Sequence, residues 1–433
     1  MLSKLISMVS SLLSLVYTLP GILPSLRLQV LVLTIWIYAP FFMLAIYFWQ
    51  PNLSVGLFFL YSCMNGYGAG GQVDYDHYNA ESMMEGDDAS SRQIQRHGSD
   101  EGHASGRNAP RPNGFMINSR GRKLYYRVII PKSQQPTCLV ILLHGYAAHF
   151  NRPGSVKFVQ ELLARNFAVA TMDFEGHGYS EGLRCYVKST NRLVQDVEQF
   201  VELIMSGSAL ISSGDDLYSP HTASGFNEKS RMVAKLPFFI SGQSMGGAIA
   251  LLSSEKIAHR GVPFPNWRGA MLLCPALDGN KPPAMVVYFL RLFVVPFFPT
   301  RTMPTFLDST SDASAIWKTK SLVQWHENFD GWGKPGALGW GENMRWGTGG
   351  ALIEMIDDVQ AVMKLCDFSV LSLHDPKDGI IPFAGTLKLK KVAPSKDISC
   401  VEMHGALHDM VTNEPGVLAG HMSAWANQRL KSK

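Results

Sequence analysis

The fold of this chain is decided by the stretch Leu236-Pro-Phe-Phe-Ile-Ser-Gly-Gln-Ser-Met-Gly-Gly-Ala-Ile-Ala-Leu251. A short apolar run ends in Gly242-Gln-Ser-Met-Gly246 and passes directly into a small-residue pattern that is typical of a packed helix. Glycines on either side of Ser244 relieve the crowding of a sharp turn, so the hydroxyl can project from the end of the strand. The segment therefore predicts a strand, an elbow that exposes a nucleophilic serine, and a helix. The alternative is a glycine-rich turn in which Ser244 only caps the helix.

Strand-like and helix-like segments alternate from Phe115 to the end of the chain. Val156–Asn166 and Leu193–Ile204 repeat apolar residues at helical spacing. Because strands that are joined by helices are buried on both faces, this alternation predicts an α/β fold with a mostly parallel, doubly wound sheet. The strand candidates after Phe115 are Lys123–Ile130, Cys138–Leu143, Phe167–Asp173, Pro237–Ser241, Ala270–Cys274, Phe368–Leu373 and Ile398–Met403.

Two segments interrupt the alternation. Ser206–Lys235 is a polar insertion, which we expect to form a surface loop. Leu277–Met363 follows the strand candidate Ala270–Cys274 and is too long for a simple connection.

The first 64 residues differ in composition from the rest of the chain. Leu28–Trp49 is a run of 22 residues in which only Gln29, Thr34 and Pro40 break the apolar character, and it is long enough to cross a bilayer. We therefore predict a membrane-anchoring region over residues 1–64, in preference to a cleaved signal peptide or a buried helix. The endoplasmic reticulum or a lipid-droplet surface would suit such an anchor. A single span and a returning hairpin both fit, so the side of the membrane stays open.

Composition sets further limits on the function. Residues 65–113 have almost no apolar content and predict a disordered linker, which leaves 114–433 as the folded domain. The net charge of +4 is small and dispersed, which argues against a nucleic-acid-binding protein. The six cysteines stand far apart, so the sequence indicates neither a disulfide framework nor a metal site.

An exposed serine is a poor nucleophile unless a base removes its proton and a third group orients that base. Two strand candidates end in loops that hold such groups, and both follow the serine in the chain. The first loop is His374-Asp-Pro-Lys-Asp-Gly379, and the second is His404-Gly-Ala-Leu-His-Asp409.

Each loop offers two candidates. Asp375 and His404 lie directly at the ends of their strands, where a turn aspartate or a surface histidine is the ordinary role. Asp378 and His408 lie farther out, so an acid and a histidine can reach each other there. We favour Asp378 as the group that orients the histidine and His408 as the general base and acid.

An acyl-transfer site also needs two N–H donors for the oxyanion. Met245, the residue after the nucleophile, supplies one donor through its backbone. We expect Tyr146 to supply the second through its backbone, because His144-Gly145-Tyr146 follows the strand candidate Cys138–Leu143.

Five blocks in a fixed order carry a family resemblance, namely His144-Gly-Tyr-Ala-Ala-His149, Asp173-Phe-Glu-Gly-His-Gly-Tyr-Ser-Glu-Gly182, Gly242-Gln-Ser-Met-Gly-Gly247, His374-Asp-Pro-Lys-Asp378 and Gly405-Ala-Leu-His-Asp409. With them the chain from Phe115 to Leu430 resembles the monoacylglycerol lipase and lysophospholipase branch of the α/β-hydrolase superfamily. The resemblance implies the α/β-hydrolase fold with a cap over Leu277–Met363, inserted after the sixth strand. It also implies the catalytic triad Ser244, Asp378 and His408, with Tyr146 and Met245 as oxyanion donors.

The chain departs from this family at Gln243, where histidine or glutamate is commoner, in the inserted loop 206–235 and in the length of the cap. Within the cap, Met285–Phe298 is apolar except for Arg291, and five tryptophans cluster after it. Such a lid suits an acyl chain or a membrane surface, although the same residues would also form a core of the cap itself.

We therefore expect a membrane-associated serine hydrolase that cleaves the acyl ester of a single-chain lipid, such as a monoacylglycerol or a lysophospholipid. The expected partners are a lipid ester and a membrane, no cofactor or metal is required, and the oligomeric state is open. A lipid acyltransferase is an alternative, because His404 to Asp409 spells H-x-x-x-x-D. A non-catalytic scaffold on the same fold is another.

Overall fold

The computed structural model describes residues 114–132, 134–213, 226–259, 264–279, 281–304, 308, 313–331 and 337–431. The predicted membrane-anchoring region 1–64 and the predicted linker 65–113 lie outside these residues, so both stay predictions. Within the described ranges, no helix combines the length and the apolar character that a membrane span needs. The fold belongs to the compact unit of Val73–Thr302 with Asp308–Lys433.

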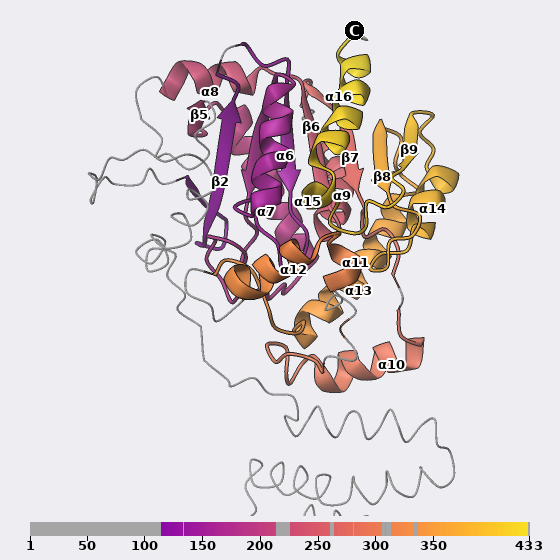
Figure 1. Cartoon of the computed structure of the whole chain (residues 1–433). Helices are drawn as coiled ribbons and strands as arrows, with labels where there is room; N and C mark the ends of the chain where they lie inside the picture. The colour runs from indigo at the N-terminus through magenta and orange to yellow at the C-terminus, as the bar shows by residue number, and fades with distance from the viewer. Residues whose placement is uncertain are drawn as a thin grey trace, which may run out of the picture. The chain divides into compact units, whose positions relative to one another are not determined.

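A twisted sheet of nine strands runs through the described domain (Figure 1). Only the β1–β2 and β2–β4 pairs are antiparallel, and the other pairs are parallel. The predicted α/β class with a mostly parallel sheet is therefore confirmed. Along the sheet the order is β1 (Phe115–Ile117), β2 (Lys123–Ile130), β4 (Phe167–Met172), β3 (Cys138–Leu143), β6 (Phe238–Gln243), β7 (Trp267–Leu273), β8 (Val370–His374) and β9 (Ile398–Glu402), while β5 (Ile211–Ser213) pairs with the end of β2.

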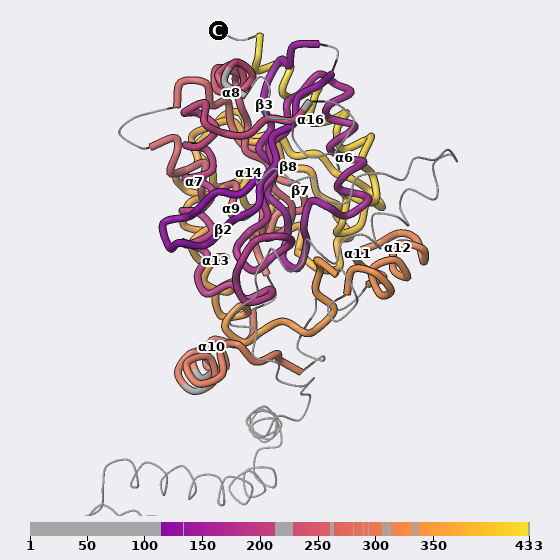
Figure 2. Tube along the Cα trace, turned by 90° about the vertical axis from the view of Figure 1, so that its left-hand side faces the viewer, coloured from indigo at the N-terminus to yellow at the C-terminus, as the bar shows by residue number. Residues whose placement is uncertain are grey.

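Helices cover both faces of this sheet (Figure 2). Every residue of the central strands β3 and β4 is buried, as expected for parallel strands between two helical layers. The apolar core accordingly falls into two clusters, one on each side of the sheet. One layer contains α7 (Thr190–Met205), α8 (Phe226–Ala234), α9 (Met245–His259), α13 (Trp346–Val362) and α14 (Ala384–Val392), and the other contains α6 (Pro153–Ala164), α15 (Met410–Asn413) and α16 (Pro415–Lys431).

The polar insertion Ser206–Lys235 contains regular elements in its described parts, 206–213 and 226–235, where we expected a surface loop. It holds β5 and α8, and Val233 of α8 is fully buried in the core. A strand of three residues and a helix of nine are too short for hydrophobic periodicity to reveal them. Because β5 precedes it, the cap follows the seventh strand of the structure, β7, rather than the sixth.

The cap contains short helical pieces beyond one end of the sheet (Figure 1). They are α10 (Ala284–Phe289), the π-helical segment η1 (Leu290–Val294), α11 (Ala313–Ile316), α12 (Lys320–Trp325) and the π-helical segment η4 (His326–Asp330). We expected the cap to continue to Met363. Instead α13 packs against α7 and α9, with Met355 and Val359 in the core, so the segment that stands off the sheet ends before Trp346.

Candidate active site

Ser244 lies at a sharp turn between β6 and α9, as the sequence predicts. Its φ of 55° is in the left-handed region, which is strained for a residue with a side chain. The flanking glycines are needed because a Cβ on Gly242 would lie 2.1 Å from the carbonyl oxygen of Gly246, and one on Gly246 would lie 2.4 Å from that of Leu143. The local sequence therefore builds an elbow that leaves the Ser244 hydroxyl free to project.

The Ser244 hydroxyl meets the two partners that the sequence favours. Its Oγ lies 2.9 Å from Nε2 of His408, and Nδ1 of His408 lies 2.8 Å from Oδ2 of Asp378. The three side chains follow β6, β8 and β9, which are separated along the chain but lie in one parallel sheet. Through this series of hydrogen bonds, His408 can accept the proton of Ser244 while the carboxylate of Asp378 holds the imidazole ring in place. The catalytic roles themselves stay a prediction.

Asp378 is enclosed by hydrogen-bond donors. Its Oδ1 accepts the backbone N–H groups of Ile380 at 2.8 Å and Ile381 at 3.0 Å, and its Oδ2 lies 3.3 Å from Nε2 of His374. Burial alone would raise the pKa of Asp378, but the hydrogen bonds from His374 and His408 outweigh it and hold the pKa well below its usual range. The carboxylate is therefore charged and can stabilise an imidazolium.

His374 is a neighbour that the sequence reasoning did not assign a role. Its Nε2 faces two acceptors, Oδ2 of Asp378 and the carbonyl oxygen of Ile381, so that nitrogen carries the hydrogen. Its Nδ1 then accepts from the hydroxyl of Thr386 at 2.9 Å. The signal was present as a histidine four residues before the aspartate in the same loop.

The two competing candidates have other partners. Asp375 accepts backbone N–H groups from Lys377 and Leu407, both at 2.9 Å, so it fixes the acid loop against the histidine loop. The side chain of His404 is 71% exposed and pairs with Glu402. Among the described residues, neither side chain forms a hydrogen bond with Ser244.

The loop that carries His408 is held from three sides. The carbonyl oxygen of His408 accepts from Nε2 of Gln243 at 3.2 Å and from Sγ of Cys274 at 2.8 Å. The next residue, Asp409, accepts from Gln243 at 3.1 Å and from Nε1 of Trp317, in the cap, at 2.9 Å. Gln243 therefore helps to position the histidine loop. Asp409, the aspartate of the H-x-x-x-x-D pattern, helps to hold the same loop through its hydrogen bonds to Gln243 and Trp317.

One cluster in the described part of the chain has atoms close enough to hold a metal ion, and it consists of Cys274, Asp378 and His408. Burial, followed by the charge of Asp378, raises the pKa of Cys274 well above its usual range. A protonated thiol that donates to a carbonyl is a poor metal ligand. The chemistry of these three groups fits the proton relay rather than a metal.

The expected oxyanion donors lie beside the serine. A Cβ on Gly145 would lie 3.2 Å from Cβ of Ser244, so the Gly145–Tyr146 peptide passes next to the nucleophile. Nε2 of His144 accepts the N–H of Phe174 at 2.9 Å, which leaves Nδ1 as the donor to the carbonyl oxygen of Gly145 at 2.7 Å. Because the N–H of a trans peptide points opposite to its C=O, this bond also fixes the direction of the Tyr146 N–H.

Two further features support this arrangement of donors. Burial, with a further contribution from His177, keeps the pKa of His144 well below its usual range, so the ring is neutral. Met245 is the first residue of α9, where backbone N–H groups have no partner within the helix and the helix dipole favours negative charge.

A buried cluster ties the cap to the oxyanion loop, and the sequence reasoning missed it. Asp330, at the end of η4, accepts from Nε2 of His149 at 2.7 Å and from Nε of Arg152 at 2.8 Å. The same Arg152 donates to the carbonyl oxygen of Ala147 at 2.7 Å. The spacing of His149 and Arg152 just after the His-Gly pair was the available signal, but nothing in the sequence connected them with Asp330.

Comparison with known proteins places this chain in a family. Residues 134–210 and 222–416, more than half of the chain, match the sequence model of Hydrolase_4, described as serine aminopeptidase, S33. The chain belongs to this family.

Relatives and solved structures agree with the family assignment. Monoglyceride lipase of Rattus norvegicus is 24% identical to this S33-family chain over 319 residues, which cover 73% of the chain and 90% of the relative. Caffeoylshikimate esterase of Arabidopsis thaliana is 22% identical over 317 residues, with 71% and 83% covered. A soluble variant of monoglyceride lipase from Saccharomyces cerevisiae, solved with a substrate analogue, has a TM-score of 0.54 and 18% identity, with 76% of this chain and 99% of that one covered.

These matches confirm two predictions. The S33-family chain lies in the monoacylglycerol lipase branch of the α/β-hydrolase superfamily, and it is a carboxylic ester hydrolase. The structural likeness at this identity concerns the fold.

Proposed function

We propose that this chain is a serine hydrolase that cleaves the acyl ester of a single-chain lipid, a monoacylglycerol or a lysophospholipid. The observation that carries the proposal is the hydrogen-bonded series Ser244 Oγ, His408 and Asp378, with distances of 2.9 and 2.8 Å. Membership of the S33 family and the monoglyceride lipases among the relatives support the ester and the lipid class.

The proposed reaction has two halves. As Ser244 Oγ attacks the ester carbonyl, His408 Nε2 takes the serine proton and Asp378 stabilises the resulting imidazolium. The backbone N–H groups of Tyr146 and Met245 hold the oxyanion. His408 then gives the proton to the leaving alcohol, which departs and leaves an acyl-enzyme. In the second half, His408 deprotonates a water molecule that attacks the acyl carbon; the bond to Ser244 Oγ then breaks, His408 returns the proton to Ser244, and the fatty acid is released.

The surface of the cap supports a substrate that resides in a lipid phase. Three of its large apolar side chains are mostly exposed, namely Met285 at 79%, Tyr288 at 63% and Phe297 at 69%. Met285 and Tyr288 belong to α10, and Phe297 lies shortly after η1, so all three come from one part of the cap sequence. Large apolar side chains that are exposed to solvent favour contact with acyl chains at a lipid surface.

Attachment to a membrane through residues 1–64 is part of the proposal and rests on the apolar run Leu28–Trp49. Flotation of the full chain with phosphatidylcholine vesicles, compared with a chain that lacks residues 1–64, tests this part. Equal flotation of the two chains would rule out anchoring by that region.

A fluorophosphonate probe tests the nucleophile. We expect covalent labelling of the wild-type chain at Ser244, none in Ser244→Ala, and release of fatty acid from monoacylglycerol by the wild type only. Labelling of a different residue, or full turnover by Ser244→Ala, would reject the proposal.

Acyl transfer is distinguished from hydrolysis by the products. In the structure the histidine of the H-x-x-x-x-D pattern, His404, is exposed and paired with Glu402, and its aspartate supports the histidine loop. This arrangement favours hydrolysis. With an added alcohol acceptor, we expect free fatty acid as the main product; a new ester as the main product would favour the acyltransferase.

A further inference from the structure

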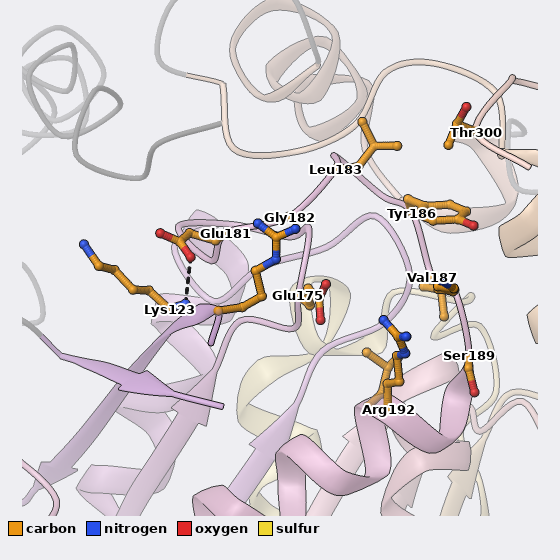
Figure 3. A pocket seen from close by; sticks show the side chains of 13 residues that line it. Lys123, Glu175, Glu181, Gly182, Leu183, Tyr186, Val187, Ser189, Arg192 and Thr300 are labelled. Carbon is orange, nitrogen blue, oxygen red and sulfur yellow. Dashed lines mark hydrogen bonds between the residues drawn. The ribbon is translucent and has the colours of Figure 1, made fainter. Parts of the chain in front are cut away.

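A cavity of about 630 Å³ lies at the start of α7, and none of the residues proposed for catalysis lines it (Figure 3). Its walls come from the start of β2, the loop that follows β4 and the first turn of α7. We call it the α7 cavity, and its lining includes Arg122, Tyr186, Lys188, Ser189, Arg192 and Thr300. The proposed ester hydrolysis does not use any of these side chains.

Cationic side chains predominate in the α7 cavity. Four basic residues line it, against two carboxylates. The two acids are already engaged, because Glu175 pairs with Arg120 at 2.7 Å and Glu181 accepts the backbone N–H of Lys123 at 2.9 Å.

Three of the four basic side chains that line the cavity have no acidic partner among the described residues. Within the described ranges, no hydrogen bond or ion pair is formed by the side chains of Arg122, Lys188 and Arg192. Like charges that share one cavity repel each other, and the acid of α7 one turn beyond Arg192, Asp196, is already paired with Arg120 at 2.6 Å. The cavity therefore has an excess of positive charge that an anion would neutralise.

The start of α7 adds to this positive charge. Its N-cap residue, Ser189, makes no side-chain hydrogen bond to the first turn, and that turn carries no acidic side chain. Arg192 instead rises from the first turn into the cavity, as Figure 3 shows. A cation at the positive end of a helix dipole lowers the stability of the helix, so stability does not account for Arg192. An anion held between Arg192, Ser189 and the first N–H groups of α7 does account for it.

We propose that the α7 cavity binds a phosphate group. Guanidinium groups bind phosphate oxygens through paired N–H donors, and a lysine adds a point charge, so Arg122, Arg192 and Lys188 suit this ligand. The same group occurs in small phosphate esters and in the headgroups of lipids. The site lies outside the proposed catalytic residues and does not depend on the proposed hydrolase activity.

Calorimetric titration of the full chain in non-ionic detergent tests the free-phosphate source, with inorganic phosphate and with glycerol 3-phosphate at constant ionic strength. We expect binding by the wild type, and a loss of about tenfold in affinity for each arginine removed in Arg122→Gln/Arg192→Gln. The control, Lys157→Gln/Lys396→Gln, removes the same charge from exposed positions on α6 and before β9 and should bind as the wild type does.

Vesicles test the lipid source. We compare co-sedimentation with phosphatidylcholine vesicles that contain or lack phosphatidic acid. The difference between the two measurements excludes vesicle binding by other parts of the chain that does not depend on phosphatidic acid. The phosphatidic acid-dependent increase should be lost in the arginine variant and kept in the control. Because Lys188 is exposed, Lys188→Glu gives a second variant with little risk to folding, and it should abolish binding in the same assay.

Loss of binding in the cavity variants in either assay, with the control unchanged, supports the site and identifies the source of the phosphate. Equal binding by the cavity and control variants, replacement of phosphate by chloride without loss of the signal, or no binding in both assays would overturn the proposal.

Discussion

Arg152, at the end of the oxyanion loop, donates a hydrogen bond of 2.8 Å to Asp330 in the cap. Asp330 is 2% exposed, and a second donor, Nε2 of His149, reaches its other oxygen. Since Arg152 also holds the carbonyl of Ala147, which follows Tyr146, one buried carboxylate connects the position of the cap with the backbone beside the nucleophile.

Replacement of Asp330 by asparagine should therefore affect both stability and turnover. An amide presents an N–H where the carboxylate accepted a donor, so one of His149 and Arg152 loses its partner. We expect a loss of about 3–5 kcal/mol in the free energy of unfolding and a fall in kcat on the order of tenfold or more. The matched control is Asp357→Asn, whose side chain is 61% exposed and pairs with Lys281. Urea unfolding and steady-state kinetics measure the effects, and parity of the two variants would contradict this account of Asp330.

Ser244→Ala should lower kcat by about 10⁴-fold or more while the free energy of unfolding changes little. Removing the hydroxyl abolishes the nucleophile, and alanine leaves the elbow backbone in place. Fatty-acid release from a monoacylglycerol measures the first quantity and urea unfolding the second. Residual activity above a hundredth of the wild-type rate would show that another group attacks the ester.

Asp378→Asn should lower kcat by about 10⁴-fold with the backbone geometry kept. The amide cannot stabilise an imidazolium, and its N–H group would face Nδ1 of His408 and so favour the wrong tautomer. The rate of labelling by a fluorophosphonate should fall in parallel, because the serine is no longer activated. An unchanged labelling rate would show that Asp378 does not act through His408.

Gly246→Ala tests the packing of the elbow. The new Cβ would lie 2.4 Å from the carbonyl oxygens of Leu143 and His144, which are backbone atoms that cannot move aside. We expect the free energy of unfolding to fall by about 3 kcal/mol, together with slower probe labelling. Gly420→Ala, on α16 with open space around it, is the control and should stabilise the chain by up to about 1 kcal/mol. Similar unfolding midpoints for the two variants would refute the steric argument.

His177 should make the fold sensitive to acid. Burial lowers the pKa of His177 from 6.5 to about 3. Between these values the unfolded chain binds a proton that the folded chain does not, so the free energy of unfolding falls as the pH drops below 6.5, by up to about 1.4 kcal/mol per pH unit. His177→Phe should remove this part of the slope, whereas His421→Phe, at an exposed position on α16, should keep it. Urea unfolding between about pH 5 and pH 8 measures the slopes, and identical slopes for all three chains would disprove the prediction.

The positions of most strands along the chain and the geometry of the elbow could be predicted because both depend on short-range physics. Apolar runs of strand length and the two glycines around Ser244 carry that information within a few residues. The sequence did not predict the elements of the insertion around β5 or the residue at which the cap ends. There the elements are short, and α13 joins the core because its apolar face meets α7 and α9 rather than because of a signal at its ends.

The sequence by itself determined the class of the fold, the family and the identity of the candidate triad, because a fixed order of strand-end loops leaves few residues able to meet. Only the tertiary structure decided which side chains support that triad. Gln243 reaches the carbonyl oxygen of His408, and Asp330 reaches Arg152, only through contacts between separate strands and the cap. Such contacts depend on how distant segments pack, and no local pattern records them.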